Sequence, residues 1–185
     1  MSDAPPDPVG DAVAYLLRLL AQRDYTRQEL AARLARRGVD DASATAALAR
    51  LADLELLDDA RVGAAHVRGR AHRKGRLALA RELARRGLDE ATRETLLGEL
   101  DDAQQREAAA GVLAKERWRF AASDPRANRA KAGAFLTRRG FPGDVVRDLV
   151  EDAFPVDEAA APDDADPPDP EGDGAAPEGG GGRSV

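Results

Sequence analysis

A five-residue pattern, Leu-x-Arg-Arg-Gly, occurs three times in this chain and constrains its fold more than any other feature. The starts of successive copies are 49 and 53 residues apart, and each copy is followed by one apolar residue. A period near 50 residues is typical of proteins built from stacked, structurally similar units. The pattern therefore predicts three related units in series. Its defining positions are Leu34, Arg36, Arg37, Gly38, Leu83, Arg85, Arg86, Gly87, Leu136, Arg138, Arg139 and Gly140.

Each copy of this pattern, which we call the pentad, has the character of a helix C-terminus. Arginines favour the negative end of a helix dipole, and a glycine just after the helix can adopt the left-handed conformation that ends it. Asp40 and Asp89 then stand where they can cap a following helix, and Pro142-Gly143-Asp144 offers a similar start in the third copy. Helix-end electrostatics would explain the six pentad arginines, and so would contact with a partner.

A further helix is expected before each pentad helix. The first, at about residues 11–23, has apolar residues at helical spacing; the second, at 58–74, runs from the Asp58-Asp59 cap to a break at Gly75; the third, at 103–120, precedes the breaker Ser123-Asp124-Pro125. Thr26-x-x-Glu29 matches a capping box that would open the first pentad helix. No segment alternates as a strand would. The sequence thus predicts an all-α fold of three tandem three-helix repeats, helix-turn-helix-like, in an elongated array, either straight or curved.

The predicted repeats span residues 11–57, 58–101 and 102–154. The flanking leader, 1–10, and tail, 155–185, are expected to be disordered, because they hold too few apolar side chains to offset the entropy of ordering them.

Charge is distributed unevenly along the chain. The formal net charge is -6, but the tail contributes nine acidic residues against Arg183, and the leader contributes Asp3 and Asp7. Without these flanks the body holds 27 basic and 23 acidic residues, a balance of +4. A basic body suits a polyanionic partner. The tail would then act as a weak intramolecular competitor for the basic face, a hypothesis from charge alone.

Residues that carry enzyme chemistry are sparse. The chain has no cysteine, which excludes disulfides, thiolate nucleophiles and cysteine-based zinc sites. His66 and His72 are six residues apart and point in different directions on a helix, so we interpret them as surface residues rather than metal ligands. Asp58-Asp59 is interpreted as a helix cap, and the glycine run 179–182 lies in the tail, without the strand and helix of a phosphate loop. We predict no enzyme activity, no cofactor and no metal.

The apolar residues give no sign of a membrane segment. The best apolar run, Val13 to Ala21, is interrupted by Arg18, and the first residues lack the features of a signal peptide. We expect a cytoplasmic monomer. Trp118 and Phe120 are interpreted as core or inter-repeat packing rather than as a surface on which bases stack.

Residues 68–86 form the most basic stretch, with eight basic residues against Glu82, a net charge of +7 in nineteen residues. Most isolated surface charges are merely solvated, and a solvated surface remains an alternative here. The density of charge favours contact with phosphate or carboxylate groups. The candidate binding residues are Arg68, Arg70, Arg73, Lys74, Arg76, Arg81, Arg85 and Arg86.

Three segments resemble signatures of the RecX family. The segment from Leu57 through Asp58-Asp59-Ala60-Arg61, with Gly75 and residues 82–88, resembles the central one; residues 131–141 resemble the C-terminal one; and residues 25–30 with Gly38 resemble the N-terminal one. The resemblance covers nearly all of residues 11–154. The chain departs from the family at Val62 and Gly63, where an aromatic residue and alanine are common, and its acidic tail lies outside the family pattern.

The resemblance implies a regulatory protein that binds RecA and its nucleoprotein filament. Such proteins modulate, and mostly inhibit, filament extension, ATP hydrolysis, strand exchange and the SOS coprotease activity. The resemblance implies no catalytic motif. The alternative is a helical-repeat protein that binds DNA directly, without RecA. Weak direct contact with DNA is also compatible with a regulator of RecA. A helical adaptor for an unrelated partner is a further rival, and an enzyme comes last.

Overall fold

A computed structural model describes residues 7–120 and 124–156. Over these residues the chain forms nine α-helices and one 3-10 turn, and no strand. The predicted all-α class is thereby confirmed. The elements are α1 (Pro8–Leu20), α2 (Arg27–Arg36), α3 (Asp41–Asp53), α4 (Asp59–Arg70), α5 (Arg76–Arg85), α6 (Glu90–Gly98), α7 (Asp102–Glu116), η1 (Arg117–Phe120), α8 (Pro125–Arg138) and α9 (Gly143–Ala153).

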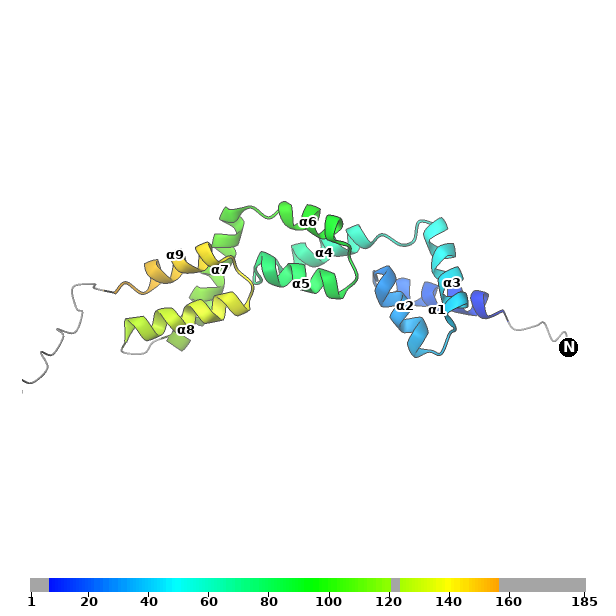
Figure 1. Ribbon diagram of the computed structural model, residues 1–185, viewed down its shortest axis with the longest axis horizontal. Coiled ribbons are helices and arrows are strands. Elements are labelled where there is room, and N and C mark those ends of the chain that lie inside the picture. The colour runs from blue at the N-terminus through cyan, green and yellow to red at the C-terminus, as the bar shows by residue number, and fades with distance from the viewer. Residues whose placement is uncertain (1–6, 121–123, 157–185) are drawn as a thin grey trace, which may run out of the picture.

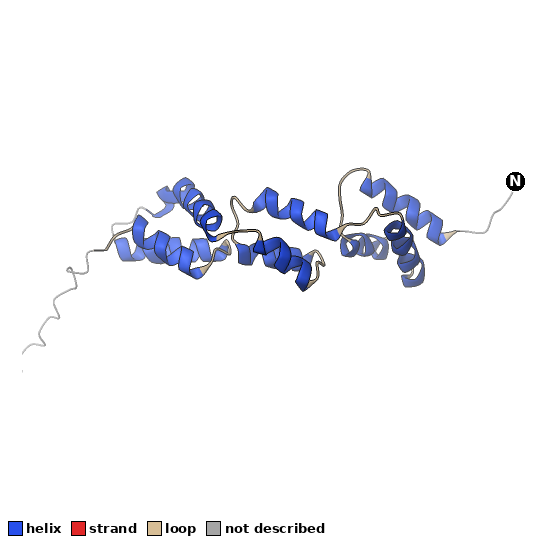
Figure 2. Ribbon diagram, turned by 90° about the horizontal axis from the view of Figure 1, so that it is seen from above, coloured by secondary structure: helices blue, strands red, loops and turns tan. Residues whose placement is uncertain are grey.

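The helices are grouped in threes along an elongated array (Figure 1). In the first unit α1 and α2 both pack on α3, in the second α4 and α5 pack on α6, and in the third α7 and α8 pack on α9. The view from above shows the same linear succession of three groups (Figure 2). The prediction of three tandem three-helix repeats in an elongated array is confirmed.

Each pentad ends its helix in the same way. In the first copy the Val39 amide donates to the Leu34 carbonyl at 3.1 Å, and the Gly38 amide donates to the Ala35 carbonyl at 3.0 Å. The same two bonds recur after α5 and after α8. This is the Schellman motif, which requires a left-handed residue. The three pentad glycines supply it, with φ between +78° and +88°.

Acidic side chains fix most helix starts, as the sequence predicts. Asp40, Asp58 and Asp89 each accept a hydrogen bond from the backbone amide three residues later. The capping box is also present, because Thr26 accepts from the Glu29 amide at 3.2 Å while Glu29 accepts from the Thr26 amide at 3.2 Å. Pro142 begins α9 without a side-chain cap.

The pentad leucine is the centre of each unit's core. Leu34, Leu83 and Leu136 are completely buried, as are the residues four positions earlier. Three separate apolar clusters result, one for each unit. Each unit therefore has its own small core, and the stability of the array depends both on these cores and on how the units join.

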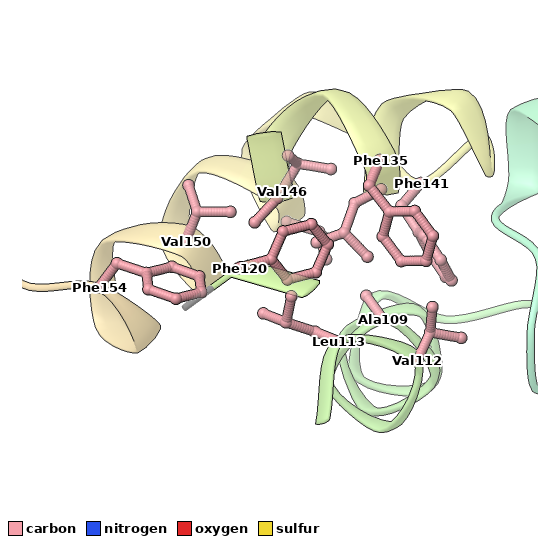
Figure 3. Packing of buried hydrophobic residues seen from close by; sticks show 12 residues of the cluster. Ala109, Val112, Leu113, Phe120, Phe135, Phe141, Val146, Val150 and Phe154 are labelled. Carbon is pink, nitrogen blue, oxygen red and sulfur yellow. The ribbon is translucent and has the colours of Figure 1, made fainter. Parts of the chain in front are cut away.

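The third core contains phenylalanines, which the other two cores lack. Figure 3 shows Phe120, Phe135 and Phe154 gathered beneath α8 and α9. The rings of Phe120 and Phe135 are 5.6 Å apart, and Phe154 meets Phe120 edge-on at 6.4 Å. Phe141, which follows the pentad, is 1 % exposed and completes this core.

The structure corrects several local expectations. Helix α1 begins at Pro8 rather than near residue 11, because Asp7 caps the Gly10 amide at 2.8 Å and proline suits the first turn. Helix α4 ends at Arg70, four residues earlier than expected. Trp118 does not pack in a core: η1 follows α7 and leaves its side chain 76 % exposed, while Phe120 is buried as predicted.

The departure at Val62 and Gly63 leaves a packed interior. Val62 is 5 % exposed, and a side chain on Gly63 would overlap Leu88 and Leu96. These two leucines therefore fill the space above the glycine. The expected disorder of residues 1–6 and 157–185 lies outside the described residues.

Candidate functional site

The first two repeats are joined end to end through their pentad helices. The C-terminus of α5 meets the N-terminus of α2: the Thr26 hydroxyl donates to the Arg86 carbonyl at 2.6 Å, and Gly87 lies against Gln28 so closely that a side chain there would overlap it. Beside this contact, Asp59 accepts a hydrogen bond from the Arg27 amide at 2.8 Å. The sequence assigned Asp59 to a helix cap, but it bridges two repeats.

An ion-pair network reinforces this first joint. Arg86 contacts Glu29 through two nitrogens, at 3.1 and 3.2 Å, and also lies 2.9 Å from Nδ1 of His66. Nε2 of His66 is 2.8 Å from Glu82, which also binds Lys74. His66 is thus a member of a partly buried network, and its interpretation as a surface residue is wrong. His72 is exposed, as expected.

The network perturbs the pKa values of its members. Burial lowers the pKa of His66, and the positive charges of Arg86 and Arg70 lower it further, against the opposing effect of Glu82. Burial favours the neutral form of Glu29, but hydrogen bonds from Arg86 and the Thr26 amide, with nearby positive charge, bring its pKa below the usual value. In the folded protein the neutral form of His66 and the charged form of Glu29 are therefore favoured.

The second and third repeats meet through an equivalent joint. The C-terminus of α8 meets the N-terminus of α5, where the Gly75 amide donates to the Arg139 carbonyl at 2.9 Å and the Leu77 amide donates to the Gly140 carbonyl at 3.0 Å. A side chain on Gly75 would overlap the Gly140 backbone, and one on Gly140 would overlap Ala78. Both glycines are required by the close approach.

Arg76 reinforces the second joint. Its amide donates to Oε1 of Gln105 at 2.7 Å, its guanidinium binds the Leu100 carbonyl, and it lies 3.5 Å from Asp102. Gln105 is completely buried. Sequence reasoning missed Thr26 and Gly75 as joint residues, although one signal was available: each stands eight positions before its pentad leucine.

The structure separates the eight candidate binding residues of the basic stretch. Lys74, Arg76 and Arg86 are engaged within the protein, and Arg70 lies 3.8 Å from Glu82. Arg68 lies apart, beside a cavity of about 570 Å³ between α4, α6 and α7. Arg73 is exposed, and its carbonyl faces the Arg139 guanidinium at 3.5 Å. Arg81 and Arg85 remain exposed on α5.

The two arginines of each pentad have different environments. The second arginine makes local contacts: Arg86 pairs with Glu29, Arg139 lies over the Phe135 ring, and Arg37 lies over the Tyr15 ring. The first arginine of each copy, at 36, 85 and 138, is exposed.

Exposed and half-buried arginines line two hollows on either side of α5. One, of about 350 Å³, is lined by Arg81, Arg85, Arg138 and Arg139 together with Lys74. The other, of about 210 Å³, is lined by Arg85 with Arg33 and Arg36. Because Arg85 belongs to both, the residues form one continuous surface across both joints. We call it the arginine stripe, defined by Arg33, Arg36, Arg81, Arg85, Arg138 and Arg139.

The arginine stripe carries positive charge that the described part of the protein does not neutralise. None of its six members forms an ion pair with an acidic side chain there, while Glu82, which borders one hollow, is already bound to Lys74 and His66. Guanidinium groups in such an arrangement bind phosphate or carboxylate oxygens bidentately. The stripe is thus suited to a polyanion or an acidic protein surface.

Other kinds of site find little support in the described ranges. No group of three or more potential metal ligands occurs within residues 7–120 and 124–156. Within the same ranges, no helix has the length and apolarity needed to cross a bilayer.

Fold and surface together define a class: a helical-repeat protein whose units are joined end to end and share one cationic face. Family models for the three RecX three-helix domains match residues 12–51 (first), 58–97 (second) and 104–150 (third). Together these matches cover well over half of the chain. The protein belongs to the RecX family.

The similarity of the chain to individual RecX proteins supports this family assignment. A "Regulatory protein RecX" from Halorhodospira halophila is 38% identical over 134 residues, covering 71% of this chain and 81% of the relative. Another from Chromohalobacter salexigens is 41% identical over 154 residues, covering 83% and 97%. The crystal structure of RecX from Lactobacillus salivarius has a TM-score of 0.70 at 22% identity, covering 80% of this chain and 97% of that one, and supports the fold.

Proposed function

We propose that this protein is a non-enzymatic, monomeric cytoplasmic regulator that binds RecA and its nucleoprotein filament. Binding restrains filament extension and, with it, ATP hydrolysis, strand exchange and the SOS coprotease activity. Membership of a family whose relatives are named regulatory proteins supports a regulatory role. The observation that carries the proposal is the arginine stripe, which runs across all three repeats.

The geometry of the stripe suits an extended target. Its arginines come from α2, α5 and α8, which follow one another along the array (Figure 1). A filament repeats its charged groups at regular intervals, so several weak contacts add up along the array. The two joints hold the arginines in a fixed relation, which lowers the entropy lost on binding.

Charge reversal within the stripe tests this proposal. The triple variant Arg81→Glu, Arg85→Glu, Arg138→Glu should keep its helicity, because none of these side chains has an acidic partner in the described structure. We expect at least tenfold weaker inhibition of RecA ATPase on single-stranded DNA. The matched control, Arg50→Glu, Lys115→Glu, Arg117→Glu, makes the same charge change at exposed positions outside the stripe and should inhibit nearly as well as the unmodified protein.

Equal inhibition by both triple variants would contradict a role for the stripe, and absence of inhibition by the unmodified protein would contradict the proposed function. The concentration dependence distinguishes mechanisms: inhibition at substoichiometric amounts favours capping of filament ends, whereas inhibition near saturation favours coating of the groove.

Direct DNA binding without RecA is the second candidate, because guanidinium groups free of acidic partners also bind the phosphates of naked DNA. It predicts tight binding to naked duplex, with affinity falling by roughly one log unit per log unit of salt for each phosphate contacted. Filament binding far stronger than naked-DNA binding at the same salt concentration would exclude it.

A further inference from the structure

The C-terminal end of α2 has the structure of a joint, but it meets no partner among residues 7–120 and 124–156. The ends of α5 and α8 each meet the start of the preceding pentad helix, through Gly87 and Gly140. Gly38 ends α2 with the same hydrogen bonds and a φ of +78°, yet nothing lies within 4 Å of the position that a side chain on it would occupy.

The two occupied joints show what such an end binds. In both, backbone carbonyls at the arginine or glycine of the pentad accept hydrogen bonds from the first turn of a helix, or from its cap. The second pentad arginine then contacts the incoming segment: Arg86 pairs with an acid in that first turn, Glu29, and Arg139 reaches the carbonyl of Arg73. Opposite ends of two helix dipoles meet, which is electrostatically favourable.

A second copy of the chain does not offer the matching helix start. Thr26 and Gly75 open α2 and α5 eight positions before the pentad leucine, but the equivalent position in the third repeat, Asn128, lies inside α8 and is buried. Its amide is already bonded to the Asp124 carbonyl at 3.1 Å. At the α8 end of the array, the longer helix thus replaces the helix start that a joint needs, whereas at the other end the C-terminus of α2 is uncovered.

We propose that the open end of α2, formed by Arg36, Arg37 and Gly38, is a docking site for the N-terminal turn of a helix in a partner protein, with an acidic residue in that turn to pair with Arg37. A hollow of about 490 Å³ lies beside this end, lined by Arg37, Gly38 and Val39 from the turn and by residues of α1. Asp11, Asp40 and Arg18 also line it, so the site combines charged groups of both signs with an open glycine backbone.

The proposal rests on the proposed function, because the partner is taken to be the RecA filament. Docking here would fix the direction in which the array lies on the filament, since only one of its two ends is open. The arginine stripe would then supply attraction along the length, and the open end would supply a specific protein contact.

Gly38→Asn tests the docking site in the full-length protein. Asparagine tolerates the left-handed conformation, so the fold is retained. Its side chain would, however, fill the space beside residue 38 that corresponds to the space occupied by a neighbouring helix at Gly87 and Gly140. We expect at least tenfold weaker binding to RecA filaments on single-stranded DNA, with unchanged helicity. The matched control is Gly69→Asn, at another glycine with nothing within 4 Å, which should bind as the unmodified protein does.

A second variant keeps the glycine and changes the charge. Arg37→Glu should weaken filament binding by a similar factor, because it places a carboxylate opposite the acid expected in the partner. Undiminished binding by both Gly38→Asn and Arg37→Glu, while the unmodified protein binds, would overturn the docking site and leave the proposed function standing. If the unmodified protein fails to bind the filament, both proposals fall together.

Discussion

His66 makes the ion-pair network at the first joint sensitive to pH. Nδ1 faces a guanidinium nitrogen of Arg86, which only donates, so Nδ1 must accept; Nε2 then carries the proton and donates to Glu82. This arrangement requires the neutral ring. Protonation would place an N–H group against the N–H of Arg86, which is why burial and Arg86 together lower the pKa of His66.

The first prediction concerns acid stability. Because the pKa of His66 is lower in the folded protein than its ordinary value of about 6.5, the unfolded chain binds more protons below that pH, and the free energy of unfolding must fall as the pH decreases. The contribution of one group is at most about 1.4 kcal/mol per pH unit. Urea unfolding between pH 7 and pH 5 measures it.

His66→Gln is the informative variant. Glutamine can donate to Glu82 and accept from Arg86 but does not titrate, so we expect a flatter dependence of stability on pH in this window. The lowered pKa values of Glu29 and Glu82 act below their ordinary value of about 4.5, outside the window. An equally steep dependence in His66→Gln and in the unmodified protein would show that His66 is not the responsible group.

At the scale of the element, the helix ends have two roles: they begin and end the helices, and they also form the joints between repeats. The pentads, the aspartate caps and the apolar spacing sufficed to predict the helices, because these effects act within four residues. They did not predict the joints: Gly75 and Gly140 are 65 residues apart, and only the tertiary packing brings them into contact. Likewise, α7 ends at Glu116, before the end of the helix predicted at 103–120, and the following η1 leaves Trp118 exposed.

The second prediction compares two pentad glycines. Gly38→Ala and Gly140→Ala both place a side chain at positive φ, which costs about 1–2 kcal/mol. Only at Gly140 does the added atom also overlap a neighbouring helix, at Ala78. We expect Gly140→Ala to be the more destabilised of the two and to change the solution shape, whereas Gly38→Ala keeps it. Thermal unfolding and small-angle X-ray scattering measure both effects; the same profile for both variants would contradict the assigned joint.

At the scale of the whole molecule, residues that are neighbours in sequence serve different surfaces. The basic stretch 68–86 crosses from α4 to α5, so Arg68 faces one cavity, Arg76 and Arg86 hold joints, and Arg81 and Arg85 reach the stripe. The sequence identified the excess of charge but could not assign it to faces. Arg33 and Arg36, from the first repeat, belong to the stripe because α2 and α5 meet end to end.

The charge of the whole chain leads to the last prediction. The tail's nine acidic residues have the sign and number to compete with a polyanion for the arginine stripe, whose six arginines lack acidic partners in the described ranges. Deletion of residues 155–185 should therefore strengthen filament binding at low salt. The gain should shrink as the salt concentration rises, because screening weakens both the competitor and the target.

A matched control separates charge from length in this experiment. A full-length variant in which the nine tail acids are replaced by their amides keeps the length of the tail and removes the competing charge, so it should bind as strongly as the deletion variant. If the deletion alone strengthens binding, the tail acts by excluded volume rather than by charge. If neither change alters affinity at low salt, the tail does not compete for the stripe, and the cationic face is open to its target at all times.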